Sequence, residues 1–196
     1  MLAAVILAAG ASIRMGAPKA QIPYRGRTFL EHLLEVARHP RIELTRVVIG
    51  AGANELRDKI ALDPSCIVFN PDWQKGQLSS IQAALRSLPP GKTEGVILFL
   101  VDQPLITAAV VGELIKKFDT GGKPIAIATY HGRRGHPVIF RSDLYEELLA
   151  APLDIGARAV VWAHAKEILE VPTEEEGVVL NLNDPDTLKR AMGTLD

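Results

Sequence analysis

Residues 2–19 read LAAVILAAGASIRMGAPK, an apolar run that leads into a loop of small residues and two cations. The run from Leu2 to Leu7 is typical of a buried strand. The glycines of the loop let the backbone bend and approach a ligand closely, while Arg14 and Lys19 add positive charge. An α/β protein holds a polyphosphate with such a loop, at the carboxyl edge of its sheet. The stretch therefore predicts a phosphate-binding α/β fold.

The spacing of this loop excludes two other phosphate-binding motifs. The dinucleotide fingerprint G-x-G-x-x-G would need a glycine at position 12, where this chain has Ser12. The P-loop G-x-x-x-x-G-K-[ST] needs four residues between its glycines and a lysine after the second glycine. Here five residues separate Gly10 from Gly16, and Ala17 follows Gly16. An ordinary strand-to-helix turn that happens to contain glycine remains the alternative.

Apolar runs alternate with amphipathic segments along the chain, which predicts a mainly parallel central sheet with helices on both faces. The expected strands are residues 3–7, 46–49, 67–69, 96–101, 125–129, 137–140, 168–171 and 178–182. The expected helices are residues 29–38, 54–62, 79–88, 108–118, 144–149, 155–164 and 186–192. Thr28 and Thr107 are expected to cap two of them. There is no internal repeat or linker, so we expect a single domain over residues 1–196.

The composition limits the class of protein. A formal net charge of −1 argues against nucleic-acid binding, which usually needs a basic excess. The apolar N-terminus is too short for a membrane span and lacks the basic region of a signal peptide. The single cysteine, Cys66, lies in an apolar stretch and is expected to be a buried thiol in a reducing compartment. We therefore expect a cytoplasmic protein with no membrane or nucleic-acid partner.

Three further segments carry candidate site residues. Asp102 ends an apolar strand, and its carboxylate suits Mg²⁺, although it could instead cap the helix that starts near Thr107. Ser79 and Ser80 begin a helix, where they could bind a base edge or an anion, or simply cap the helix. Asp184 precedes Pro185 near the end of the chain and suits a turn with a helix cap.

These pieces together resemble one family in order along nearly the whole chain. The string L-A-A-G-x-S-x-R-M-G-x-P-K is followed by N-P-x-W, G-x-x-x-S-I, D-Q-P, G-H-P, D-x-G-A-R and a terminal N-D-P. They resemble the nucleotidyltransferases of glycosyltransferase-A-like fold, in particular the molybdenum cofactor nucleotidyltransferases. The L-A-A-G form is similar to the cytidylyltransferase version, whereas L-A-G-G marks the guanylyltransferase version. One departure is Leu153, where a glycine is common before Asp154, and it bears on the identity of the acceptor.

The resemblance implies a Rossmann-like nucleotidyltransferase fold that transfers CMP from CTP to the terminal phosphate of molybdopterin and releases pyrophosphate. It implies Mg²⁺ held by Asp102 and Asn183, with Asp184 as the runner-up to Asn183. The implied catalytic residues are Arg14, Lys19 and Asp102. The implied nucleotide-binding residues are Leu7, Ala8, Ala9, Gly10, Ser12, Gly16, Gly76 and Ser80, with Trp73 as a packing residue. His136 and Arg158 are implied on the acceptor side.

The resemblance also divides the chain into a nucleotide-binding half, about residues 1–105, and an acceptor-binding half, about residues 106–196. His136 is expected to bind the acceptor phosphate or to be structural, because an ionised phosphate needs no general base to attack. The other expected partner is a molybdoenzyme or its maturation chaperone, in transient contact. Three alternatives remain: GTP as donor, another phosphorylated acceptor such as a sugar phosphate or methylerythritol phosphate, or a non-catalytic cofactor carrier.

Overall fold

The computed structural model of this chain describes residues 1–11, 18–53, 56 and 62–193. Its strands are β1 (Leu2–Ala8), β2 (Pro23–Tyr24), β3 (Arg27–Thr28), β4 (Ile42–Ile49), β5 (Ile67–Phe69), β6 (Gly95–Leu100), β7 (Ile125–Tyr130), β8 (Arg133–Arg141) and β9 (Ile168–Pro172). Its helices are α1 (Phe29–Val36), α3 (Gln77–Arg86), α4 (Ala108–Gly121), α5 (Tyr145–Ala150), α6 (Arg158–Ala163) and α7 (Pro185–Gly193). Short 3₁₀ turns lie between them, among them η2 (Lys19–Gln21), η3 (Pro64–Cys66), η6 (Ala165–Glu167) and η7 (Glu176–Val178).

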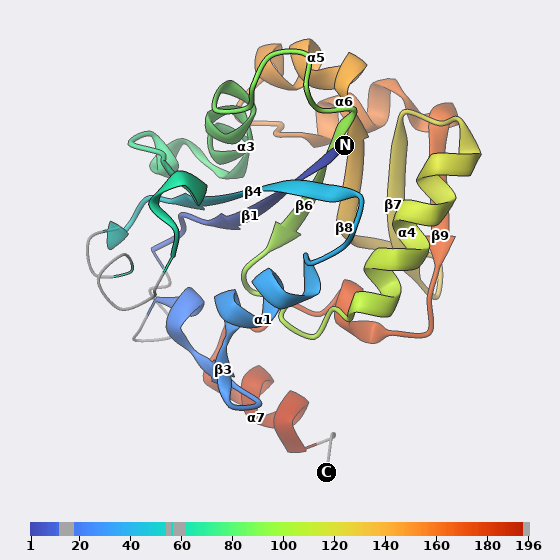
Figure 1. The fold of residues 1–196 in the computed structure, drawn as a ribbon. Helices are drawn as coiled ribbons and strands as arrows, with labels where there is room; N and C mark the ends of the chain where they lie inside the picture. The colour runs from blue at the N-terminus through green and yellow to red at the C-terminus, as the bar shows by residue number, and fades with distance from the viewer. Residues whose placement is uncertain (12–17, 54–55, 57–61, 194–196) are drawn as a thin grey trace.

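Seven strands form one sheet in the order β5-β4-β1-β6-β8-β7-β9 (Figure 1). Every neighbouring pair is parallel except the two that involve β8, which runs antiparallel to both β6 and β7. The mainly parallel α/β fold expected from the sequence is thus confirmed. Because β1 and β6 pair in parallel, with Leu7 opposite Leu100, the loops that follow them leave the sheet at the same edge.

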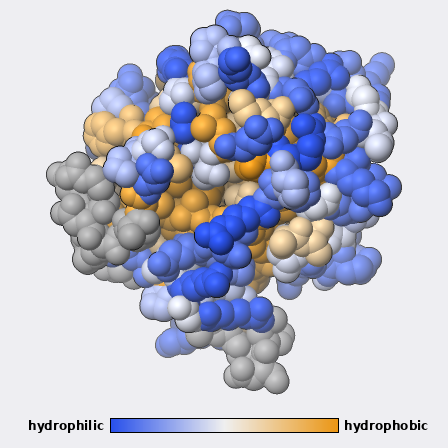
Figure 2. Space-filling view, viewed as in Figure 1, coloured by the Kyte–Doolittle hydropathy of each residue, from blue (hydrophilic) through white to orange (hydrophobic). Residues whose placement is uncertain are grey.

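Helices cover both faces of the sheet, and β1 shows how the sequence builds the two layers. Its residues Leu2, Ala4 and Ile6 pack in the cluster that includes α1 and α4. Ala3 and Val5, which alternate with them, pack in the cluster with α3, α5 and α6. Figure 2 shows hydrophobic atoms gathered in the middle of one face of the molecule, between hydrophilic residues above and below.

Two helix caps predicted from the sequence are confirmed. Thr28 caps α1 in a capping box with Glu31, and Thr107 caps α4 through the amide of Val110. The strand expected over residues 178–182 is wrong. Val178 and Leu182 are fully buried, but neither pairs in the sheet. Val178 packs with Val110 of α4 and Ala128 of β7, and Leu182, in the core cluster with α1, donates its amide to the main-chain oxygen of Asp102. The apolar residues of this segment are buried in the core without forming a strand of the sheet.

Three smaller expectations need correction. Strand β8 extends over Arg133–Arg141, well beyond the four residues expected. Helix α6 starts at Arg158 and not at residue 155, because Gly156 has a φ of +80° that breaks a helix. Cys66 is half-buried at the end of η3 and not a core thiol. The helix expected over residues 54–62 falls almost entirely outside the described residues.

None of the helices in the described part of the chain is long and apolar enough to cross a membrane. The cytoplasmic location stays a prediction.

Candidate active site

The side chains of Lys19, Asp102 and Asn183 meet at the carboxyl edge of the sheet. Lys19 lies in η2 after the first loop, Asp102 follows β6, and Asn183 precedes α7. The Lys19 Nζ donates to Asp102 Oδ2 at 3.0 Å and to Asn183 Oδ1 at 2.5 Å. The side chains of Lys19 and Asp102 are only 18% and 20% exposed, so this charge pair is shielded from bulk water. Asp102 and Asn183 follow Lys19 by 83 and 164 positions in the sequence, so the fold brings together residues from distant parts of the chain.

Backbone and side-chain hydrogen bonds fix the C-terminal segment beside Asp102. The Leu182 amide donates to the main-chain oxygen of Asp102 at 2.7 Å. Gln103, the residue after Asp102, donates from its Nε2 to the Oδ1 of Asn181, the residue before Leu182, at 2.8 Å. Gln103 is 3% exposed, so this contact is protected from competition by water. The segment that contains Asn183 is thus positioned by direct hydrogen bonds to Asp102 and Gln103.

The oxygens of Asp102 and Asn183 suit a hard divalent cation. Both lie within hydrogen-bonding distance of the same ammonium nitrogen, so they converge on one positively charged position. Among the described residues, no group of three His, Cys, Asp or Glu side chains forms a metal site. A Mg²⁺ ion is often held by one or two protein oxygens, with water and substrate phosphates as its other ligands. The residues present fit that pattern.

Asp184, the alternative to Asn183, has a different role. Its Oδ1 accepts from the Thr187 amide and its Oδ2 from the Thr187 hydroxyl, both at 2.8 Å. The backbone hydrogen bond from Thr187 holds the pKa of the Asp184 carboxyl below its ordinary value. The carboxylate therefore stabilises the start of α7, as the turn and cap reading of the sequence predicts.

A cavity of about 370 Å³ opens beside Lys19 and Asp102. Its walls come from the first loop, the segment before α3, the start of α3 and the end of β6: Leu7, Ala9, Gly10, Lys19, Trp73, Gln74, Gly76, Gln77, Ser80, Leu100, Val101 and Asp102. Most of the implied nucleotide-binding residues in the described part of the chain thus line one hollow. Ala8 does not line it, because its side chain packs into the opposite layer, against the cluster with α1. Ser12, Arg14 and Gly16 lie outside the described residues.

Asn70 organises the wall that Ser80 contributes to this cavity. Asn70 is 2% exposed, and its Nδ2 donates to Ser79 Oγ and Ser80 Oγ, both at 2.9 Å. Its Oδ1 accepts from the Asp72 amide at 3.0 Å, which closes the turn before α3. Neither serine caps the helix. The N-cap is Gly76, whose φ of +99° favours glycine.

Trp73 closes the cavity from the side of β4. A Cβ added to Gly50 would lie 2.7 Å from the Trp73 Cβ, so the indole packs directly on the glycine backbone. The packing role expected for Trp73 fits this contact, and the same side chain also lines the cavity.

A second cavity of about 660 Å³ adjoins the first and shares Gln77 and Leu100 with it. Both residues implied on the acceptor side, His136 and Arg158, line it. So do Arg133 and Arg134, although Arg134 is paired with Glu170 at 2.8 Å. The walls also include Leu78 and Leu98, so the cavity draws on both halves of the chain.

His136 is half-buried in the wall of the second cavity. Burial lowers the pKa of His136 to about 4, although the negative charge of Asp102 opposes this. The imidazole is therefore neutral near pH 7 and can donate a hydrogen bond without adding charge. A group with so low a pKa is a poor general base at neutral pH.

Sequence reasoning missed several residues of the two cavities. Gln103 lies in the D-Q-P motif and Asn181 lies two residues before the terminal N-D-P, but nothing in the sequence shows that they bond to each other. The exposed rim of the second cavity was also missed, since Leu153, Ile155 and Trp162 are 40%, 41% and 63% exposed there. An apolar residue in a helical pattern usually indicates the core, so its exposure shows only in the fold.

Comparisons with known proteins show the family of this chain. The MobA-like NTP transferase domain matches residues 4–168. Nicotine blue oxidoreductase from Paenarthrobacter nicotinovorans is 34% identical, over 79% of this chain and 78% of that protein. Molybdenum cofactor cytidylyltransferase from Escherichia coli is 27% identical, over 93% of this chain and 91% of that protein. The structure of Rv0371c in complex with manganese, from Mycobacterium tuberculosis, has a TM-score of 0.75 at 27% identity and covers 98% of each chain.

Proposed function

Because this chain belongs to the MobA-like NTP transferase family, we propose that it transfers CMP from CTP to the terminal phosphate of the molybdenum cofactor and releases pyrophosphate. The observation that carries the proposal is the position of the Lys19 ammonium. Lys19 and Asp102 lie in the wall of the smaller cavity, which adjoins the larger one, and the ammonium contacts both Asp102 and Asn183. We assign the smaller cavity to the nucleotide and the larger one to the acceptor.

The reaction joins two anions, so charge neutralisation and alignment are the main tasks. An oxygen of the acceptor phosphate forms a bond to the α-phosphorus of CTP, and the bond from that phosphorus to the pyrophosphate oxygen breaks. Lys19, together with Arg14, would offset the charge that develops on pyrophosphate. Asp102 and Asn183 would hold Mg²⁺, which would neutralise charge on the α-phosphate. No residue has to take a proton, which agrees with the low pKa of His136.

The rim of the larger cavity favours a large acceptor over a small sugar phosphate. Leu153, Ile155 and Trp162 expose apolar surface there, and Arg158 lines the same cavity. An apolar surface next to cations fits a molecule with a planar ring system and an anionic end. The pterin of the molybdenum cofactor has this combination, whereas a sugar phosphate lacks the ring system. After transfer, the product would pass to a molybdoenzyme or its maturation chaperone.

Pyrophosphate release from a panel of substrates tests the proposal. Purified protein with Mg²⁺ is offered each of the four ribonucleoside triphosphates with molybdenum cofactor, a hexose 1-phosphate or methylerythritol phosphate. We expect release only with CTP and the cofactor, and none in the Asp102→Ala variant. Release with GTP or with another acceptor would replace the substrate assignment but keep the enzyme class. Cofactor binding without release in any combination would support a carrier.

A control addresses the relative that is named as an oxidoreductase. Oxidation of NADH or NADPH is followed with a quinone as acceptor, in the absence of any nucleoside triphosphate. We expect no turnover above that of the heat-treated protein. Turnover there, with no pyrophosphate release in the panel, would overturn the proposal.

A further inference from the structure

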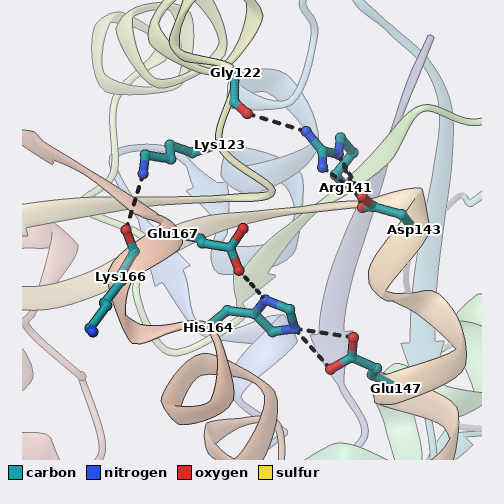
Figure 3. A network of polar contacts seen from close by, with 8 residues as sticks. All are labelled: Gly122, Lys123, Arg141, Asp143, Glu147, His164, Lys166 and Glu167. Atoms are coloured by element: carbon teal, nitrogen blue, oxygen red, sulfur yellow. Dashed lines mark hydrogen bonds and ion pairs between the residues drawn. The ribbon is translucent and has the colours of Figure 1, made fainter.

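His164 is held between two carboxylates immediately after α6 (Figure 3). Its Nδ1 lies 2.8 Å from Glu167 Oε2, and its Nε2 lies 2.9 Å from Glu147 Oε2. Glu147 belongs to α5 and Glu167 ends η6, so the imidazole connects three consecutive parts of the fold. The His164 side chain is 20% exposed, which protects both contacts in part from water.

Other charged groups face this cluster: Arg141 interacts electrostatically with Glu167, and Asp143 with His164. Arg141, on β8, is already paired with Asp143 at 2.6 Å and also donates to the Gly122 carbonyl. Lys123 donates to the main-chain oxygen of Lys166 at 3.0 Å. A neutral imidazole carries a single N–H, so it can donate to only one of the two carboxylates, whereas the protonated ring donates to both. The hydrogen bonds that the ring donates to Glu167 and Glu147 accordingly raise the pKa of His164 above its ordinary value.

Helix α6 depends on the contacts of His164 because the helix itself is short and has few residues in the core. It spans six residues, which is too short to be stable by itself, and of these Val160 is the one buried in the core. Three of its residues, Arg158, Val161 and Trp162, line the larger cavity. A protonated His164 at its C-terminal end also lies where the helix dipole favours positive charge.

We propose that His164 is a positioning residue for the acceptor cavity: bridging Glu147 and Glu167 in its protonated form, it fixes α6, and loss of its proton weakens acceptor binding. The assignment of the cavity to the acceptor rests on the function proposed above. The effect on α6 itself does not. As pH rises through the raised pKa of His164, one of the two hydrogen bonds is lost and the helix becomes less firmly held.

The first arm of the test needs no ligand. Hydrogen exchange of the amides of residues 158–164 is measured between pH 6 and pH 8.5, with intrinsic rates corrected for pH. We expect protection of these amides to fall about two- to fivefold over this range, as for the loss of one partly exposed charge contact. His164→Gln should be poorly protected at every pH, and His164→Lys should be protected at every pH, because an ammonium group can still donate to both carboxylates. His32→Gln, on α1 in the opposite layer of the fold, serves as the control.

The second arm measures the KM for molybdenum cofactor at saturating CTP over the same range. We expect this KM to rise with pH in the native chain but not in His164→Lys, while kcat and the KM for CTP change equally in both. Ionisation of the acceptor phosphate affects the KM equally in both forms, so the difference between their pH dependences reports on His164. Protection that is independent of pH in the native chain would overturn the proposal, as would an equal pH dependence of acceptor KM in the lysine variant. If the cofactor is not a substrate, the proposed function fails, while the exchange arm still decides the role of His164 in α6.

Discussion

Gly135 lies so close to Val178 that no side chain fits between them. A Cβ on Gly135 would stand 2.6 Å from the Val178 carbonyl carbon. Gly177, the residue before Val178, also packs closely on Leu105, where a Cβ would lie 2.7 Å from the leucine Cβ. The segment that leads to Asn183 is therefore wedged between β8 and the loop after Asp102.

Gly135→Ala should displace this segment and carry Asn181 and Asn183 away from Asp102. Because the clash is with backbone atoms, it cannot be relieved by rotating a side chain, and we expect a large loss of turnover together with a lower melting temperature. Gly112→Ala is the matched control, since a Cβ there meets no atom within 4 Å and the position is helical. That variant should keep its turnover and gain about 0.4–1 kcal/mol of stability. Equal turnover in both variants would show that the wedge does not position Asn183.

Most of the fold could be predicted because local signals and burial agree. The strand pattern in β1, β5, β6 and β7 and the caps Thr28 and Thr107 act within a few residues, so sequence reasoning detects them. The segment over residues 178–182 could not be predicted, since its apolar residues are buried against distant helices and strands, among them α4 and β7, without pairing in the sheet. Tertiary packing produces the same pattern there as a strand would.

The residues of the site could be predicted, but not the contacts that join them. The resemblance implied that Asp102 and Asn183 hold one Mg²⁺ and that Lys19 is catalytic, but not that the Lys19 ammonium bonds to both. The parallel pairing of β1 with β6 and the hydrogen bond from Leu182 to Asp102 bring the three together. The exposed rim at Trp162 could not be foreseen, because the pattern of apolar residues in α6 does not distinguish the core from a cavity mouth. The roles of these residues in binding and catalysis stay predictions.

Asp102→Ala should abolish turnover while the fold remains, since Asp102 follows a strand and lies outside the hydrophobic core. Loss of a metal ligand should cost at least ~2 kcal/mol of transition-state stabilisation, or a factor of ~30 or more in kcat. Asp184→Ala is the paired control: it removes the cap of α7 and should lower the melting temperature but leave kcat near that of the native chain. Near-native activity of the Asp102 variant at saturating Mg²⁺ would remove this residue from the metal site.

Lys19→Ala should lower kcat more than it weakens CTP binding, because the charge on the leaving group is larger in the transition state than in the bound nucleotide. The substitution also takes away the ammonium that Asp102 and Asn183 share. Steady-state kinetics separate the two effects, with Lys75→Ala, whose side chain is 57% exposed, as the control. A raised KM for CTP with unchanged kcat would show that Lys19 serves only in docking.

Ala9 is expected to contribute to the choice of base. It is 6% exposed and lines the smaller cavity with Gly76 and Ser80, so its methyl group narrows the space beside the base. Cytosine, a single ring, should fit there, whereas guanine would meet the methyl group and the wall formed by residues 76–80. A steric difference of this size gives only ~1–3 kcal/mol of discrimination. Hydrogen bonds from Ser80, whose hydroxyl Asn70 holds in place, would supply the rest.

We therefore expect the native chain to prefer CTP, and Ala9→Gly to relax this preference without inverting it. The ratio of kcat/KM for CTP to that for GTP, measured in both forms, decides the matter. Ala8→Gly is the control, because the Ala8 side chain packs in the opposite layer and lies away from the cavity. If the native chain used GTP as well as CTP, Ala9 would carry no information on the base, and selectivity would have to come from elsewhere in the cavity wall.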